Sequence, residues 1–288
     1  MAFNFQTFRT RALTAIVFVL VMLGGLLWNQ WSFLLLFSVI HIGCWVEYKS
    51  LIGKIDPRYL GISPIHQAGA IIAGLGFMCW MTDDQYSIGD IFLHEVGGWI
   101  LLGSLTGLIL LKLIKGRMPD WKIIGYTVGG LLYISLSWGL LADLYNEISS
   151  PTFSGNDGWL LPMLIIATIW INDTMAYIVG SFIGKTPFSP ISPKKTWEGT
   201  IGGAILAVVV VTVIAVYWLE LDMIQMIIIT ITAAVMGTLG DLFESKLKRM
   251  AGVKDSGNFM PGHGGFLDRF DSLLLATPYV WLLLFLTR

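Results

Sequence analysis

The sequence is poor in charge and in cysteine, and each shortage excludes a class of protein. Only 13% of its 288 residues are Asp, Glu, Lys or Arg, against roughly 25% in a typical soluble domain, while 55% are hydrophobic. Two cysteines, Cys44 and Cys79, each inside an apolar run, provide neither a disulfide framework nor a metal site. The net charge of −1 gives no reason to expect a nucleic-acid partner. The composition therefore predicts an integral membrane protein.

Long apolar runs fill most of the chain. A membrane-spanning helix needs about 20 mostly apolar residues. We therefore predict an all-α polytopic membrane protein with about nine spans, and we retain the first span because no small-x-small cleavage site follows it. We expect residues 1–150 to form an N-terminal region of about five spans, and residues 151–288 to form a C-terminal region whose polar loops are the candidate site of any chemistry. The predicted spans are 12–28, 32–48, 65–81, 97–114, 124–142, 159–183, 200–219, 223–240 and 271–287.

Positive charge is distributed unevenly between alternate loops. Short cytosolic loops are enriched in Lys and Arg. If the N-terminus is cytosolic, all 18 basic residues except Arg288 fall on the inner side, which supports an odd number of spans. This orientation places two polar loops, residues 184–200 and 241–270, in the cytosol. We therefore expect these two loops, and any site that they form, to face the cytosol.

The second of these loops contains the segment "PGHGG". Gly262, Gly264 and Gly265 permit positive φ angles and close backbone approach, so their N–H groups can form a nest that binds an anion. A helix is predicted to begin just after them, with Asp268 and Asp271 on one face. Carboxylates from neighbouring helices can converge on one cation, and hard oxygen ligands suit Mg²⁺. The polar loops thus contain the parts of a phosphate and metal site.

Each of these residues also has a simpler explanation when it is taken singly. A polar loop at a membrane surface is commonly just solvated, and an acidic residue in a first helical turn is commonly a cap. His263 alone indicates neither a metal ligand nor a general base. These explanations do not account for three glycines, a histidine and two aspartates that crowd together directly before a span.

Asp173 lies inside an otherwise apolar run. At 1.5 Å per residue it stands roughly 18 Å along a helix from Lys185. A carboxylate at that depth is costly if it faces lipid, so we expect it to face a bundle interior or a water-filled cavity. The alternatives are a lipid-facing side chain and a misplaced end of the span.

Residues 245–271, "SKLKRMAGVKDSGNFMPGHGGFLDRFD", resemble the signature of the phosphatidate cytidylyltransferase family, also called CDP-diacylglycerol synthases. The match runs through Ser-x-aliphatic-Lys-Arg, Lys-Asp-x-small, Pro-x-His-Gly-Gly and Asp-Arg-x-Asp. Met260 is a mild departure, because the family more often has Leu, Ile or Phe there. Upstream, "NDTMAY", "SPKKTWEG" and "GDLFES" resemble further segments of the family. The resemblance covers about residues 168–272, and the first 150 residues are characterised by hydropathy alone.

The resemblance implies Mg²⁺-dependent transfer of CMP from CTP to phosphatidate, with K⁺ as a candidate second cation. Asp241 and Asp268 would hold the metal and act as catalytic residues, together with Lys254 and His263. The expected partners are CTP, phosphatidate and membrane lipid, and a homodimer is an open option. Physical chemistry agrees, because two anionic phosphates can meet only if metal and basic side chains neutralise their charge. The residues expected to bind substrate are Asp173, Ser192, Lys194, Lys195, Lys248, Arg249, Gly262, Gly264, Gly265 and Arg269.

Two other functions remain open on the sequence. A CTP-using kinase or transferase that acts on another lipid or polyprenyl phosphate would need the same phosphate chemistry, because the motifs do not specify the acyl pocket. A transporter would account for the nine spans and for Asp173. Against a transporter, the two halves show no evident inverted repeat and no paired broken helices.

Overall fold

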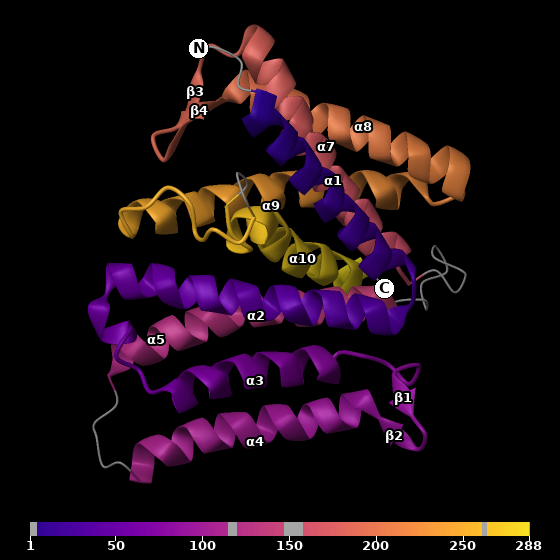
Figure 1. Cartoon of the computed structure of the whole chain (residues 1–288). Helices are drawn as coiled ribbons and strands as arrows, with labels where there is room; N and C mark the ends of the chain where they lie inside the picture. The colour runs from indigo at the N-terminus through magenta and orange to yellow at the C-terminus, as the bar shows by residue number, and fades with distance from the viewer. Residues whose placement is uncertain (1–4, 115–119, 147–157, 261–263, 288) are drawn as a thin grey trace. The chain divides into compact units, whose positions relative to one another are not determined.

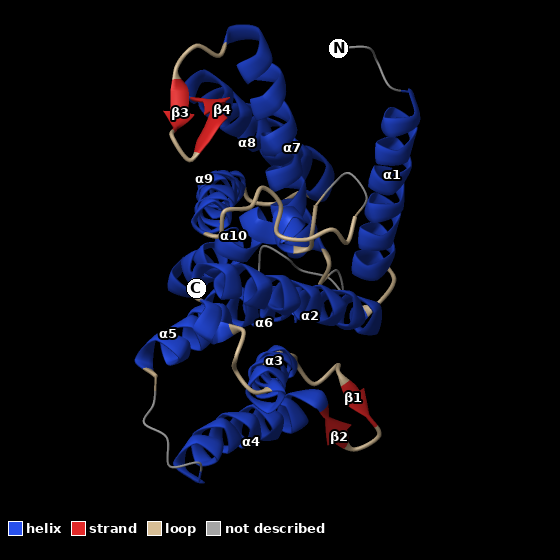
Figure 2. Cartoon of the chain, turned by 60° about the vertical axis from the view of Figure 1, so that its left-hand side comes forward, coloured by secondary structure: helices blue, strands red, loops and turns tan. Residues whose placement is uncertain are grey.

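The structure of the protein, a computed structural model, describes residues 5–114, 120–146, 158–260 and 264–287 (Figure 1). Its described residues form helices almost throughout, with two short β-hairpins (Figure 2). The prediction of an all-α polytopic membrane protein is therefore confirmed. Its contacts divide the chain into two compact units, which are Met1–Asp143 with Met250–Phe270, and Leu144–Arg249 with Asp271–Arg288.

The first unit contains the helices of the N-terminal half. Two of them, α1 and α2, are separated by Trp28 and Asn29. The side chain of Asn29 accepts a hydrogen bond from Ser32 N at 2.9 Å and completes a capping box at the start of α2. The elements of this unit are α1 (Phe5–Leu27), α2 (Gln30–Ile55), a 3-10 turn (Pro57–Tyr59), α3 (Pro64–Trp80), β1 (Ser87–Ile88), β2 (Ile91–Phe92), α4 (Leu93–Ile114), α5 (Trp121–Gly130), a π-helical turn (Leu131–Ser135) and most of α6 (Leu136–Asn146).

Small residues bring helices of the first unit into close contact. α3 and α4 lie side by side (Figure 1). A methyl group at Gly97 of α4 would overlap the backbone of Trp80, and one at Gly76 of α3 would overlap that of Leu101. Glycines at such positions let helix backbones approach closely, which is how van der Waals packing holds helices together in lipid.

The second unit contains the helices of the C-terminal half. α7 and α8 pack closely because Gly203 leaves no room for a side chain against the backbone of Asn172 and Ala176. Gly240 of α9 likewise lies against the backbone of Asp271 in α10. The elements are α7 (Leu160–Ile183), β3 (Pro187–Ser189), β4 (Ser192–Thr196), α8 (Trp197–Leu219), α9 (Met223–Met250) and α10 (Leu267–Thr287), the first four residues of which belong to the first unit.

The proline-containing loop between α7 and α8 forms an antiparallel hairpin of β3 and β4. Pro187 and Pro193 lie within these strands, where proline favours an extended backbone over a helix. Glu198 in the first turn of α8 accepts hydrogen bonds from the backbone N–H groups of Lys185 and Thr186, at 3.1 Å each. Thr196 caps the same helix by accepting from Gly199 N at 3.2 Å. These contacts fix the hairpin to the start of α8.

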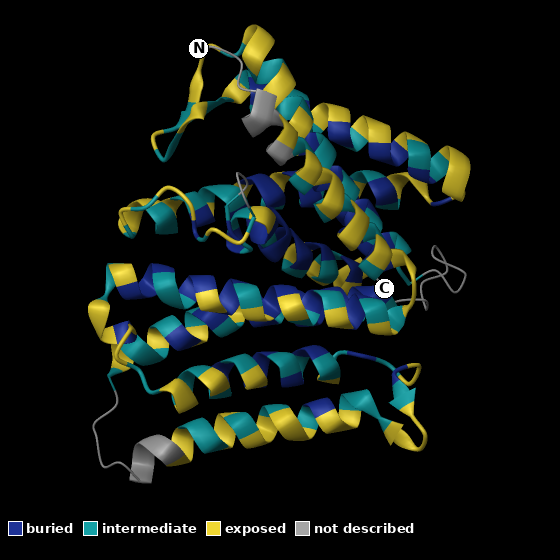
Figure 3. Cartoon of the chain, in the orientation of Figure 1, coloured by how far each residue is buried: buried dark blue, intermediate teal, exposed yellow. Residues whose placement is uncertain are grey.

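Each predicted span contains helix among the described residues, but their lengths differ. Seven stretches of described helix are long and apolar enough to cross a membrane, where α5, the π-helical turn and α6 count as one continuous stretch (Trp121–Asn146). In addition, α1 contributes a shorter apolar segment and α3 has 17 residues. The count of nine and the cytosolic N-terminus therefore stay predictions. Exposed positions run along α4 and α8 (Figure 3), where they include Trp99, Ile205 and Val213, as expected if lipid covers these surfaces.

The largest difference from the sequence prediction concerns the last polar loop. α9 continues past the expected end at residue 240 to Met250, and α10 begins at Leu267 rather than at residue 271. The expected loop of residues 241–270 is consequently shorter. Asp241 lies within a helix instead of at its end, and Asp268 lies in the first turn of α10, as predicted.

Candidate functional site

A cavity of about 420 Å³ opens in the second unit among α7, the β3–β4 hairpin and α9. Its volume lies within the roughly 300–1,000 Å³ of small-molecule sites. Asp173 lines the cavity, in agreement with the cost of placing a carboxylate in hydrocarbon. The cavity brings together several residues that the sequence selected from separate segments, namely Asp173, Ser192, Lys194, Lys195 and Asp241.

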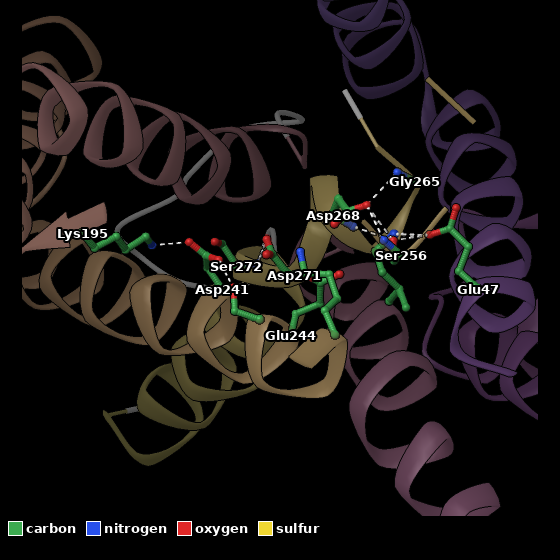
Figure 4. Close-up of polar contacts among 12 residues, drawn as sticks. Glu47, Lys195, Asp241, Glu244, Ser256, Gly265, Asp268, Asp271 and Ser272 are labelled. Carbon is green, nitrogen blue, oxygen red and sulfur yellow. Dashed lines mark hydrogen bonds and ion pairs between the residues drawn. The ribbon is translucent and has the colours of Figure 1, made fainter. Parts of the chain in front are cut away.

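Lys195 and Asp241 form an ion pair on the wall of this cavity (Figure 4). Their side chains are 28% and 26% exposed, so solvent reaches both. The other carboxylate oxygen of Asp241 accepts a hydrogen bond from Ser245 Oγ, one turn further along α9, at 3.2 Å. The carboxylate of Asp241 thus pairs with the ammonium of Lys195 in a position that solvent reaches. An anionic substrate that bound there would contact Lys195, and a metal ion would contact Asp241.

A second group of charges lies where α9 meets the part of α10 that belongs to the same unit. Asp271 is buried there and interacts electrostatically with Asp241, Glu244 and Lys248. Lys248 forms an ion pair with the fully buried Glu244, one helical turn away. The sequence treated Asp271 as a carboxylate at a helix start, but its burial among charged groups makes it part of a larger electrostatic cluster. A lysine ammonium has three N–H donors, so Lys248 could contact a phosphate while it remains paired with Glu244.

In the first unit, two carboxylates hold the loop that precedes α10 (Figure 4). Asp268 Oδ2 accepts hydrogen bonds from Ser256 N, Ser256 Oγ and Gly265 N, each at 2.8 Å. Glu47 of α2 accepts from Phe266 N and Leu267 N at 2.9 Å, and Ser256 Oγ also lies 2.8 Å from its Oε2, so the one hydroxyl proton of Ser256 is shared between the two carboxylates. The successive backbone N–H groups of Gly265, Phe266 and Leu267 thus converge on two carboxylates of the protein itself, and the predicted nest for a substrate anion at Gly262, Gly264 and Gly265 stays a prediction.

The glycines of this loop meet two separate requirements. Gly264 has a φ angle of 81°, in the left-handed region that favours glycine. A side chain at Gly265 would overlap the carboxylate of Glu47. The remaining motif residues Pro261, Gly262 and His263 lie outside the described residues.

The other predicted phosphate contacts are exposed. Lys254 and Arg269 belong to the first unit, and Arg249 belongs to the second. Each is therefore accessible to a soluble anion within its own unit.

Sequence reasoning missed several polar residues of these sites. Glu47 is the lone carboxylate of the predicted span 32–48, but it lies one residue from the predicted end, so the depth argument that selected Asp173 does not select it. Asn172 of α7 donates to Thr238 Oγ1 of α9 at 3.3 Å, and both residues line the cavity. Neutral residues in apolar runs give no comparable signal in a single sequence.

The donor chemistry of the site fits Mg²⁺ only if the substrate completes the coordination shell. In the part of the chain that the structure describes, no group of three or more His, Cys, Asp or Glu side chains is arranged to hold a metal ion. Mg²⁺ is commonly bound by one or two carboxylates, with water and substrate phosphates as the other ligands. Asp241 and Asp268 are hard oxygen donors, one in each unit. Their assignment to Mg²⁺ stays a prediction.

Comparison with known proteins gives the same family as the motifs. The chain matches the model of the Cytidylyltransferase family over residues 9–287. It is 50% identical to the phosphatidate cytidylyltransferase of Bacillus subtilis over 216 residues, which are 72% of this chain and 76% of the relative. It is 32% identical to that of Staphylococcus saprophyticus over 288 residues (96% and 98%), and 31% identical to that of Staphylococcus epidermidis over 291 residues (97% and 100%). The match includes the first 150 residues, and the chain therefore belongs to the cytidylyltransferase family.

Proposed function

We propose that this protein transfers CMP from CTP to phosphatidate, forming CDP-diacylglycerol for phospholipid synthesis and releasing pyrophosphate. The observation that carries the proposal is the cavity of the second unit, where Lys194 and Lys195 lie with Asp173 and Asp241. Two basic side chains in a cavity lined by membrane helices suit a phosphate that is attached to a lipid. The names of the relatives from Bacillus and Staphylococcus support the same reaction.

The chemistry requires charge neutralisation more than covalent participation by the protein. An oxygen of the lipid phosphate bonds to the α-phosphorus of CTP, and the bond from that phosphorus to the bridging oxygen of pyrophosphate breaks. The lipid phosphate is already a nucleophile, so the chain has no need to supply one. Lys194 and Lys195 would orient the phosphates and offset their repulsion, since fixed charges in a preorganised site favour the transition state.

Asp241 and Asp268 are the residues that would hold Mg²⁺, which when bound neutralises charge on the transferring phosphates. K⁺ is a candidate second cation. Lys248, Arg249, Lys254 and Arg269 are further phosphate contacts under this proposal, and His263 is a further catalytic candidate.

The lipid substrate would enter from the side of the helices. Tyr177 of α7 lines the cavity and is 78% exposed, so the cavity reaches the surface of a membrane-spanning helix. CTP would enter from the cytosol, at the bacterial inner membrane, because the lysine and arginine distribution places the hairpin loop inside. A homodimer stays a prediction.

Labelled CTP tests the proposal, because it distinguishes transfer of CMP from transfer of the γ-phosphate by a kinase. Purified protein in detergent is incubated with phosphatidate, Mg²⁺ and CTP that carries ³²P at either the α or the γ position. Transfer of CMP moves the α label into lipid and releases the γ label as pyrophosphate, while a kinase moves the γ label into lipid. Polyprenyl phosphate and diacylglycerol serve as alternative acceptors. Lipid labelling from the γ position alone, or only with another acceptor, would contradict the proposal.

A further inference from the structure

We propose that Glu47 of α2 is a positioning residue that holds Ser256 and residues 265–267 of the loop before α10 in the conformation that presents Asp268. The consequence for catalysis rests on the proposed function, whereas the consequence for the loop does not. Glu47 lies in the N-terminal half, outside every motif that relates the chain to its family. The N-terminal helices would then contribute to the site as well as to membrane insertion.

Both oxygens of Glu47 accept hydrogen bonds from the loop. Oε1 accepts from Phe266 N at 2.9 Å, and Oε2 accepts from Leu267 N at 2.9 Å and from Ser256 Oγ at 2.8 Å. The residue is only 8% exposed, so water is a poor substitute for these donors. Hydrogen bonds to an ionised carboxylate are stronger than those between neutral groups, and a buried charge without them is costly.

The loop joins Glu47 to Asp268 through shared donors (Figure 4). Ser256 Oγ lies 2.8 Å from Oε2 of Glu47 and 2.8 Å from Oδ2 of Asp268. Along the backbone, Gly265 N donates to Asp268, and the next two N–H groups donate to Glu47. A displacement of the Glu47 carboxylate would therefore move the donors that orient Asp268.

The packing around Glu47 is specific to a carboxylate that reaches into the loop. Side chains at Gly257 or Gly265 would overlap the Glu47 carboxylate. One turn earlier on α2, Gly43 leaves space for the ring of Phe266. Residues four apart on a helix share a face. Gly43 and Glu47 thus form one surface of α2 that fits the loop both in shape and in hydrogen bonding.

Replacement of Glu47 by glutamine preserves the size of the side chain but replaces one of its two acceptor oxygens with an NH₂ donor. A carboxylate offers acceptors on both oxygens, whereas an amide has one acceptor oxygen and one NH₂ donor. In either amide orientation the NH₂ group faces an N–H or O–H donor of the loop. Glu47→Gln should consequently release the loop without creating a cavity.

Hydrogen–deuterium exchange tests this structural part without metal or substrate. We expect Glu47→Gln to speed exchange in peptides that cover residues 256–268 by about tenfold or more, because the hydrogen bonds that protect Phe266 and Leu267 are lost. Glu198→Gln is the matched control, since Glu198 also accepts from two backbone N–H groups. The control should speed exchange at residues 185–186 and leave residues 256–268 at the wild-type rate.

The catalytic part is tested in the CMP-transfer assay. Glu47→Gln should lower kcat by about 10- to 100-fold and raise the Mg²⁺ concentration needed for half-maximal rate, with little change in the KM for phosphatidate. Ser256→Ala should have a similar effect. The double variant should be hardly worse than either single one, because residues that act as a unit are not additive. Additive losses, or a loss without any shift in Mg²⁺ requirement, would point to a general effect on folding and overturn the positioning role.

The outcomes separate the two proposals. If wild-type protein transfers no CMP but Glu47→Gln still speeds loop exchange, the proposed function fails and the loop contact stands. If exchange and turnover are both unchanged in Glu47→Gln, the role of Glu47 is overturned. Should Glu47→Gln fail to fold, Glu47→Asp keeps the charge on a shorter side chain and should give an intermediate exchange rate. Wild-type exchange in Glu47→Asp would then overturn the proposal.

Discussion

Lys195 at the end of β4 and Asp241 within α9 form an ion pair on the wall of the 420 Å³ cavity. The hairpin that carries Lys195 is fixed by Glu198 and Thr196 at the start of α8. The pair therefore joins two segments that the sequence placed in different polar loops. Under the proposed function, the pair would bring a phosphate contact and a metal ligand together on the wall of one cavity.

Lys195→Met should lower CMP transfer by about 10²-fold, because it removes a positive charge that would face the substrate phosphates. Stability should change little, since an ion pair this exposed is worth about 0–1 kcal/mol. Arg58→Met is a suitable control. Arg58 also pairs with an aspartate, Asp56, whose pKa it lowers mainly through a side-chain hydrogen bond, but it is not a cavity residue. Equal turnover in the two variants would argue against a role of Lys195 in catalysis.

Asp241→Asn should lower turnover by at least about 10²-fold and raise the Mg²⁺ requirement, because a site for a divalent cation loses a negative charge. Asp241 is a cleaner test than Asp268. The Asp268 carboxylate accepts three hydrogen bonds from the loop, so Asp268→Asn would change both metal binding and loop conformation. A Mg²⁺ titration of the Asp241 variant provides the measurement. Wild-type rate with unchanged Mg²⁺ dependence would remove Asp241 from the metal site.

The sequence predicted most of the helices, but it did not predict that polar residues at the end of a span continue the helix. Apolar runs give approximate spans because length and hydropathy are local properties. The end of α9 was misplaced because its last turns, which include Lys248 and Arg249, are helical although they are polar. Helix continues there through side-chain pairs such as Lys248 with Glu244, which hydropathy does not detect.

The candidate site shows the same division between local and long-range information. The motifs selected Asp173, Lys195 and Asp241, and the structure places them on one cavity. Glu47 was not selected, since its partners Phe266 and Leu267 lie far along the chain and donate through their backbone N–H groups. Every residue except proline has a backbone N–H group, so a contact through this group is not marked by a particular residue type in the sequence. Contacts of this kind follow from the fold alone.

Asp173→Leu should reduce CMP transfer more strongly than it reduces insertion or expression. The leucine would place a bulky apolar group in the cavity and remove a polar group beside the lysines. Thr174→Leu is the matched control, because Thr174 is exposed, bonds to the backbone of its own helix at Trp170 and does not line the cavity. Unchanged turnover in Asp173→Leu, measured on purified protein, would leave Asp173 without a functional role.

Reporter fusions should place the N-terminus and the loops after the second, fourth, sixth and eighth predicted spans in the cytosol, as the distribution of basic residues requires. The decisive position lies between Lys254 and Pro261. A tag there should be inaccessible from outside intact cells and accessible after permeabilisation. Labelling of intact cells at this position would contradict the topology and, because CTP is cytosolic, the proposed function with it.

Gly240→Ala should destabilise the packing of α9 against α10 in the second unit. A methyl group at this position would overlap the backbone oxygen of Asp271, and a backbone atom cannot rotate away as a side chain can. Overpacking of this kind typically costs about 1–3 kcal/mol. Because Asp241 follows Gly240 directly, the displaced helix would also carry Asp241 away from Lys195, so turnover should fall together with the midpoint of thermal unfolding in detergent.

Gly125→Ala in α5 is the control for that prediction. The position has open space around it, and alanine is favoured over glycine within a helix by up to about 1 kcal/mol. The control should therefore unfold at the wild-type temperature or slightly above it, with unchanged turnover. If Gly240→Ala behaved like Gly125→Ala, α9 and α10 would have room to separate, and the close approach that brings Asp271 next to the charges of α9 would not be a requirement of the fold.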